Sequence, residues 1–307
     1  MPKADSAKRG YARIAAAAVC WGASAALGRA MFTGRLLPGV IRLAPVDPLI
    51  LTQARITLAA LLLLPILAVV RKGAIRLPAG QAWRAAALGV AGMSASNYFY
   101  YLAIARTNVA TAIILQYTAP IWVVVYLVAR GRQRATWARI ATVAMALAGI
   151  ALVLELGRPG AALELDPIGV GGALLAAFAF AYYNIGGEAL TQRADAVLVS
   201  LYMLVGAAVF WLLINPPWRW WQAHYSGTQW GFFLAFSLLA TLAPTLLYIS
   251  GLRYLDPTRA VVTSCLEPVA GILLAAVFLG EALDLEKAAG VATVLGAIVL
   301  IQRRGSV

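Results

Sequence analysis

Two ionisable side chains stand inside stretches of the sequence that are otherwise apolar. Glu267 is the single carboxylate deep within the stretch 258–279, and Arg55 is the single deep basic residue, within 48–70. A charge at the centre of a bilayer costs roughly 2.5–3.5 kcal/mol on insertion scales, so it is expected to face protein or water and to have a partner. A carboxylate in that position could bind a proton or a substrate amine. A guanidinium could bind a substrate carboxylate.

Structural roles are open for both residues. Glu267 could hydrogen-bond backbone groups that Pro268 leaves free, because proline lacks an N–H. Arg55 could pair with Glu267 or Glu188, or extend its charged end toward the membrane surface.

Aromatic, hydroxyl and amide side chains form a second set of candidates, on helical faces inside apolar stretches. Tyrosine and tryptophan give broad apolar contact with one polar group, and amides orient a ligand. The residues expected to contact substrate are Trp21, Ser24, Asn97, Tyr101, Gln116, Tyr183, Asn184, Thr245, Tyr248 and Ser264. Such a cavity suits a small amphipathic metabolite. The alternative is hydrogen bonding between helices, worth about 0.6 kcal/mol a pair.

The elements that must position these residues are apolar stretches of about twenty residues, the length of a membrane-spanning helix. They predict an all-α integral membrane protein with ten spans. The expected spans are 11–32, 48–70, 81–104, 108–129, 136–154, 166–190, 196–214, 229–252, 258–279 and 285–302.

One stretch of the chain occurs twice. Pro120 and Pro268 lie 148 residues apart, and aligning them also pairs Gln116 with Ser264. Proline inside a membrane helix removes a backbone hydrogen bond, which is tolerated beside protein or a wet cavity. We therefore expect Pro120, Pro244 and Pro268 to be points at which helices bend.

The similarity between the copies extends well beyond this stretch. Asn97 matches Pro244 and Tyr101 matches Tyr248 at an offset of 147, and Trp21 matches Phe180 at an offset of 159. The chain is thus predicted to be two five-helix repeats, 1–158 and 159–307. Since five is odd, the second repeat is inverted in the membrane, which is typical of secondary transporters.

The composition excludes several classes of protein. Hydrophobic residues make up 62% of the chain and charged residues 12%, whereas soluble domains carry roughly a quarter charged residues. The net charge of +13 resides in short loops between apolar stretches, so we expect no nucleic-acid partner. With the N-terminus inside, seventeen Lys and Arg residues lie inside and seven outside, which predicts that both termini are cytoplasmic.

Residues for enzyme chemistry are scarce. The one histidine, His224, lies in a predicted outer loop, and Cys20 and Cys265 fall within apolar stretches. The chain has no HExxH, G-x-S-x-G or Walker-type motif. We therefore expect no enzyme activity, no metal site and no cofactor.

The segment LEPVAGILLAAVFLGEAL at 266–283 resembles the signature of the EamA family of the drug/metabolite transporter superfamily. QYTAPIWVVVY at 116–126 is similar to the same signature, without the glutamate and the closing Gly-Glu, and Trp21-Gly22 is similar to the family's opening Trp-Gly. The resemblance covers almost the whole chain. It implies a central cavity lined by spans 1, 3, 4, 6, 8 and 9. It leaves the substrate open.

These observations together predict a transporter of the cell inner membrane that exports a small, amino-acid-like metabolite by alternating access. The sequence leaves open whether transport is coupled to protons or to exchange. It also leaves open whether the protein is a monomer or a homodimer. The alternatives are multidrug efflux, a non-transporting membrane receptor and an intramembrane enzyme. The inverted repeat disfavours the receptor, and the lack of a reactive cluster disfavours the enzyme.

Overall fold

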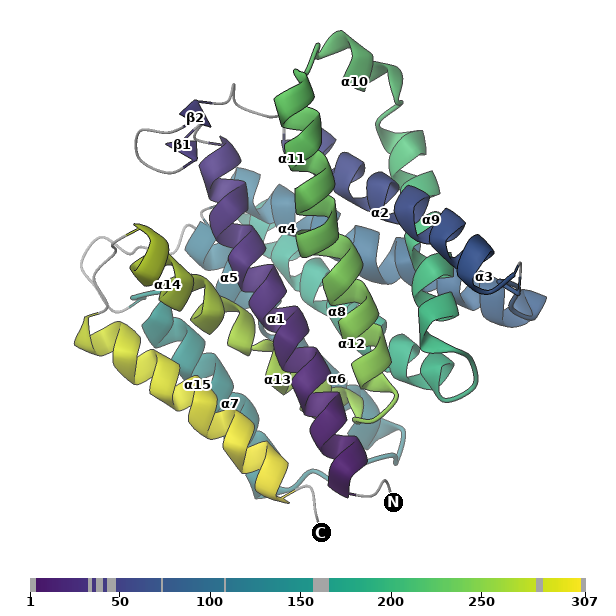
Figure 1. Ribbon diagram of the computed structural model, residues 1–307. Helices are drawn as coiled ribbons and strands as arrows, with labels where there is room; N and C mark the ends of the chain where they lie inside the picture. The colour runs from purple at the N-terminus through teal and green to yellow at the C-terminus, as the bar shows by residue number, and fades with distance from the viewer. Residues whose placement is uncertain are drawn as a thin grey trace.

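The computed structural model describes residues 4–32, 35–36, 41–42, 48–72, 74–107, 109–156, 166–279 and 284–304. Within these ranges the regular secondary structure is helical apart from one short hairpin, in which β1 (Arg35–Leu36) pairs antiparallel with β2 (Ile41–Arg42). Both chain termini lie at one end of the helical bundle, called here the termini end, and the hairpin lies toward the opposite end (Figure 1).

All ten predicted spans are present, some as one helix and some as consecutive segments. The first repeat consists of α1 (Ala4–Phe32), α2 (Pro48–Val70), α3 (Ala79–Leu88), the π-helix η1 (Gly89–Ser94), α4 (Ala95–Arg106), α5 (Val109–Gln116), α6 (Ala119–Ala129) and α7 (Trp137–Val153). The second consists of α8 (Pro167–Thr191), α9 (Ala196–Ile214), α11 (Gly227–Ser237), the π-helix η2 (Leu238–Leu242), α12 (Ala243–Leu252), α13 (Pro257–Ser264), α14 (Leu266–Leu279) and α15 (Leu285–Arg304). A further short helix, α10 (Trp218–Gln222), connects α9 to α11 at the end opposite the termini (Figure 1).

Six helical stretches in the described part of the chain are individually long and apolar enough to cross a membrane. They are Leu49–Val70, Thr111–Ala129, Pro167–Thr191, Ala196–Ile214, Gly227–Leu252 and Leu285–Arg303. Trp137–Val153 is apolar but shorter.

Several helices begin at a side chain that accepts a hydrogen bond from the first turn. Asp166, Asp195 and Asp256 do so for α8, α9 and α13, and Ser226 forms a reciprocal pair with Gln229 at the start of α11. The free N–H groups of a helix start need such an acceptor. These capping residues lie in or next to the connections between the predicted spans, so the four helices begin near the predicted positions.

The two repeats are interrupted at matching positions. The third span of each repeat contains a π-helical turn, η1 in the first and η2 in the second. In the second repeat Pro244 follows this turn, whereas the matching residue of the first repeat is Asn97. Matched irregularities indicate that the fold itself, and not proline alone, requires them.

The fourth span of each repeat is broken into two helices. α5 ends at Gln116 and α6 begins at Ala119, while α13 ends at Ser264 and α14 begins at Leu266. Pro120 and Pro268 are the second and third residues of the helices that follow. Because neither has an N–H, the carbonyl groups four residues earlier, at Gln116 and Ser264, lose their usual helical donors.

The helices of the two repeats pack into one bundle. α1 packs against α12, α13 and α14, α4 against α8, α2 and α3 against α9, and α7 against α15. Figure 1 shows α7 and α15 side by side at the margin of the bundle, with α1 crossing its front. The faces that carry the candidate residues therefore meet around α1, α4, α8, α12 and α14.

Candidate functional site

Four aromatic side chains from three helices form a cluster in the bundle, called here the aromatic cluster. Trp21 of α1 lies with its ring 5.1 Å from Tyr248 of α12 and 6.4 Å from Phe180 of α8. Tyr183 lies 5.7 Å from Tyr248 and stacks on Phe180 at 5.8 Å. These separations are in the range of favourable aromatic pairs. The cluster brings together three of the predicted substrate contacts.

The hydroxyl of Tyr248 connects this cluster to polar groups of α8 and α13. The Tyr248 hydroxyl donates a 2.6 Å hydrogen bond to Asn184 Oδ1, and Asn184 Nδ2 donates at 2.7 Å to the Phe180 carbonyl. The Ser264 side chain also lies within hydrogen-bonding reach of the Tyr248 hydroxyl. The break between α13 and α14 is thereby attached to the aromatic cluster.

A second group of polar side chains surrounds Glu267. The Tyr117 hydroxyl lies within hydrogen-bonding reach of the Glu267 carboxylate, and Arg55 is close enough for its charge to act on the same carboxylate. One terminal nitrogen of Arg55 donates to Asn97 Oδ1 at 2.9 Å. These four residues, called here the ionisable group, come from α2, α4, the break between α5 and α6, and α14.

The two groups are held together by a close approach of α1 to α14. A Cβ atom on Gly22 would lie 2.6 Å from the Glu267 carbonyl oxygen and 2.7 Å from the Gly271 nitrogen. Only glycine permits this distance. Because Gly22 allows α1 to approach α14 this closely, its neighbour Trp21 lies near Glu267.

The remaining predicted contacts are dispersed around this centre. Gln116 Nε2 lies 3.4 Å from Ser96 Oγ, and Tyr101 lies beside Tyr100 with the rings 5.8 Å apart. Thr245 is buried, and Ser24 donates at 2.8 Å to the carbonyl of Trp21 in its own helix. The Ser24 hydroxyl therefore serves the backbone of α1 in this conformation.

One suggested pairing is wrong. Glu188 does not pair with Arg55, because it forms an ion pair with Arg132 at 2.9 Å at the termini end. Arg55 instead points inward to Asn97 and does not extend toward the membrane surface.

The structure adds two residues, Tyr117 and Phe180, to those expected to contact substrate. Tyr117 follows Gln116 and lies off the face defined by every fourth residue, but the helix break at 117–118 turns it toward Glu267. Phe180 matches Trp21 across the repeats, so the sequence contains a signal for its position.

The two halves of the site differ in exposure. Tyr183, Asn184, Thr245, Tyr248 and Ser264, all from the second repeat and nearer the termini end, are at most 3% exposed. The candidates nearer the opposite end are partly exposed. They are Arg55, Asn97, Tyr101 and Gln116, and Glu267 between the halves is also partly exposed.

The termini end is closed by an apolar core and by polar links between the repeats. Ile14, Leu252 and Leu255 are buried there with the aromatic cluster. Gln133, in the turn before α7, donates to Asp256 at 3.1 Å and accepts from Thr258 at 3.0 Å. The loop between α6 and α7 is therefore attached to the start of α13.

Comparison with known proteins agrees with this architecture. The model of the EamA-like transporter family matches residues 8–155 and 167–303. The chain is 26% identical over 206 residues to the uncharacterized inner membrane transporter YicL of Salmonella typhimurium, covering 66% of this chain and 67% of YicL. It is 28% identical over 233 residues to the uncharacterized transporter YwfM of Bacillus subtilis, covering 72% of this chain and 73% of YwfM.

A solved crystal structure has the same fold. It superposes with a TM-score of 0.74 at 19% identity and covers 98% of this chain and 97% of the other. The family match extends over both repeats, and the fold match extends over nearly the whole chain. The chain therefore belongs to the EamA-like transporter family, a family of membrane transporters and not of enzymes.

Proposed function

We propose that the protein exports a small, amino-acid-like metabolite across the cell inner membrane by alternating access. The observation that carries this proposal is the meeting of the ionisable group with the aromatic cluster at the break between α13 and α14. An amino acid has an ammonium, a carboxylate and a side chain, and the site offers a complementary group for each.

In this proposal Glu267 and Arg55 bind the two charges of the substrate. Glu267 receives the ammonium group, and proton or exchange coupling acts through its carboxylate. Arg55 receives the carboxylate through its Nε atom, which is buried and has no hydrogen-bond partner among the described residues. A guanidinium suits this role because it presents several donors in one plane.

The aromatic cluster receives the apolar part of the substrate. Trp21 and Phe180 are its partly exposed members, whereas Tyr183 and Tyr248 are buried. Gln116, Asn97 and Tyr101 contact the substrate from the first repeat, while Ser24, Asn184, Thr245 and Ser264 line the part of the path that is now closed.

Alternating access is supported by the difference between the two ends of the bundle. We assign residues 1–158 and 159–307 to the two repeats and both termini to the cytoplasm, following the distribution of Lys and Arg. In that orientation the closed end faces the cytoplasm. Rocking of the repeats around Pro120, Pro244 and Pro268 would then open the cytoplasmic side.

The experiment is uptake into proteoliposomes with a panel of radiolabelled amino acids and the lipophilic cation ethidium, with and without a pH gradient. The matched variant is Glu267→Gln, which keeps the shape and removes the charge. We expect at least about a tenfold loss of amino-acid transport, equivalent to about 1.4 kcal/mol. Transport of ethidium alone would favour multidrug efflux. Full amino-acid transport by Glu267→Gln would overturn the assigned role.

A further inference from the structure

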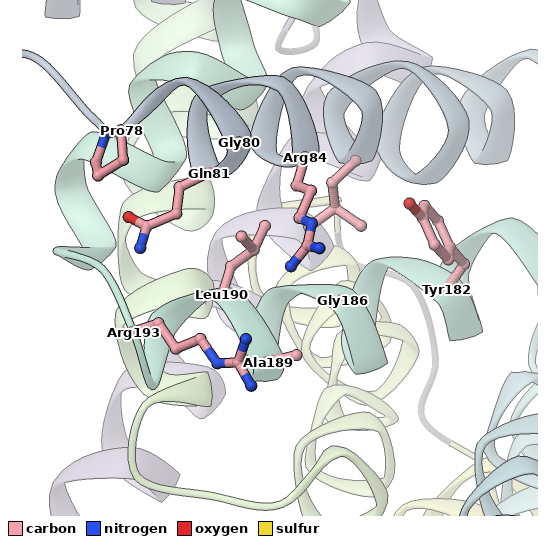
Figure 2. Close-up of a pocket in the computed structure, with 10 residues that line it drawn as sticks. Pro78, Gly80, Gln81, Arg84, Tyr182, Gly186, Ala189, Leu190 and Arg193 are labelled. Atoms are coloured by element: carbon pink, nitrogen blue, oxygen red, sulfur yellow. The ribbon is translucent and has the colours of Figure 1, made fainter.

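A groove at the termini end, between α3 and α8, is separate from the substrate path. Its volume is about 640 Å³, within the range of small-ligand sites. Figure 2 shows α3 above and α8 below, with Gln81 and Arg84 extending from α3 toward α8 and Leu190 extending toward α3. Arg193, just beyond the last turn of α8, also lines the groove.

The charge of the groove is positive and is not balanced by its own lining. Its lining includes Arg84 and Arg193 and contains no carboxylate. Both arginine side chains are exposed, and neither is joined to a carboxylate in the part of the chain that the structure describes. Two guanidinium groups facing one groove favour an anionic ligand.

The carboxylates nearest to Arg193 in the chain are already engaged. Glu188 pairs with Arg132 at 2.9 Å. Asp195 pairs with Arg71 at 3.2 Å and accepts hydrogen bonds from the N–H groups of Val197 and Leu198. Partial burial raises the pKa of Asp195, but the Leu198 N–H and Arg71 outweigh it and hold that pKa below its usual value. Neither carboxylate is available to neutralise the groove.

The groove is polar at one end and apolar along its length. Gln81, Arg84 and Arg193 lie toward the membrane surface, where α3 begins and α8 ends. Gly186 and Tyr182 continue the groove along α8. Because a helix rises about 1.5 Å per residue, Tyr182 lies about 16 Å along the helix axis from Arg193. This order of charged and then apolar lining matches a phospholipid, with its phosphate at the surface and its acyl chain below.

We propose that the groove between α3 and α8 binds an anionic phospholipid of the leaflet on the termini side. The phosphate lies between Arg84 and Arg193, and one acyl chain follows Leu88, Gly186 and Ala189. Basic pockets between membrane helices at this depth are suited to acidic headgroups. The bound lipid would join α3 of the first repeat to α8 of the second.

The test is native mass spectrometry of the full-length protein with phosphatidylglycerol or phosphatidylcholine added to the detergent. We expect the wild type to retain more phosphatidylglycerol than phosphatidylcholine. The double variant Arg84→Gln/Arg193→Gln should retain at least about five-fold less phosphatidylglycerol than the wild type. The matched control is Arg130→Gln/Arg134→Gln, which removes two exposed charges of the same end and should retain the lipid as the wild type does.

A second variant tests the acyl part with both arginines intact. Ala189→Trp fills the apolar length of the groove and should also weaken retention. Inorganic phosphate or glycerol 3-phosphate at millimolar concentration should not displace the lipid. Unchanged retention by Arg84→Gln/Arg193→Gln, or an equal loss in the control, would overturn the proposal. Displacement by free phosphate with full retention by Ala189→Trp would show a simple anion site instead.

Discussion

The backbone of Gly22 passes so close to Glu267 that a Cβ atom at position 22 would lie 2.6 Å from the Glu267 carbonyl oxygen. This contact couples the helix that carries Trp21 to the helix that carries the ionisable carboxylate. It also gives a physical reason for the Trp-Gly pair near the start of the chain. Any side chain at this position must separate α1 from α14.

Gly22→Ala is therefore expected to destabilise the protein by about 1–3 kcal/mol, the usual range for forced overpacking. Transport should fall as well, because Glu267 moves with its backbone. The matched control is Gly171→Ala in α8, where an added Cβ meets no atom within 4 Å. Thermal unfolding in detergent and uptake into proteoliposomes measure the two effects. Equal behaviour of the two variants would contradict the contact.

Tyr248→Phe tests the buried hydrogen bond to Asn184. Tyr248 and Asn184 are both 0% exposed, so loss of the hydroxyl leaves the Asn184 oxygen without this donor. We expect a loss of about 1–3 kcal/mol in the free energy of unfolding. Tyr126→Phe, at a position that is 42% exposed, should change stability little. If both substitutions have the same small effect, the bond does not hold α8 to α12.

Arg55→Lys separates charge from geometry in the ionisable group. Lysine keeps a positive charge near Glu267 but lacks the planar set of donors of arginine. We expect the variant to fold and to bind substrate at least about tenfold more weakly. Competition by unlabelled substrate in proteoliposomes gives the apparent affinity. Wild-type affinity would mean that Arg55 serves only to balance the charge of Glu267.

Gln133→Ala tests the link that holds the termini end closed. Its two hydrogen bonds, to Asp256 and from Thr258, join the repeats directly. The nearby Arg132–Glu188 ion pair is half exposed on the arginine side and is expected to contribute little. A cysteine introduced by Ala260→Cys, at a position with 0% exposure, reports opening through its reaction with a maleimide.

We expect Gln133→Ala to raise that reaction rate several-fold by increasing the open population. Arg130→Gln, which removes a charge from the same loop without a hydrogen bond to α13, is the control. A rate that is unchanged in Gln133→Ala, or raised equally in both variants, would show that the apolar core alone closes this end.

The sequence was sufficient for the fold because its strongest signals are long and duplicated. Ten apolar stretches and five matched pairs of residues predict the spans, the repeat and its inversion. Exposure within the bundle was not predictable, because it depends on which half of the transporter is closed. Tyr101 and Tyr248 are matched residues, yet the first is partly exposed and the second is fully buried.

Tyr117 shows why site residues are harder to predict than spans. Counting every fourth residue assumes an unbroken helix, and the helix is interrupted at Tyr117 and Thr118. The pairing of Glu188 failed for a different reason. The partner of a carboxylate near the end of a helix depends on which loop packs against that end. The sequence does not predict that the loop containing Arg132 packs against Glu188.

The difference between the two repeats also predicts the other conformation of the transporter, in which the termini end is open. In the closed half, Tyr248 lies within hydrogen-bonding reach of Ser264. Their partners in the repeat are Tyr101 and Gln116, which lie in the half that is partly exposed. Since the repeats are inverted, exchanging their conformations predicts that Tyr101 and Gln116 meet when Tyr248 and Ser264 separate. Cysteines at 101 and 116 should then cross-link faster in the Gln133→Ala background. Each repeat thus shows the conformation that the other repeat adopts when the transporter opens to the opposite side.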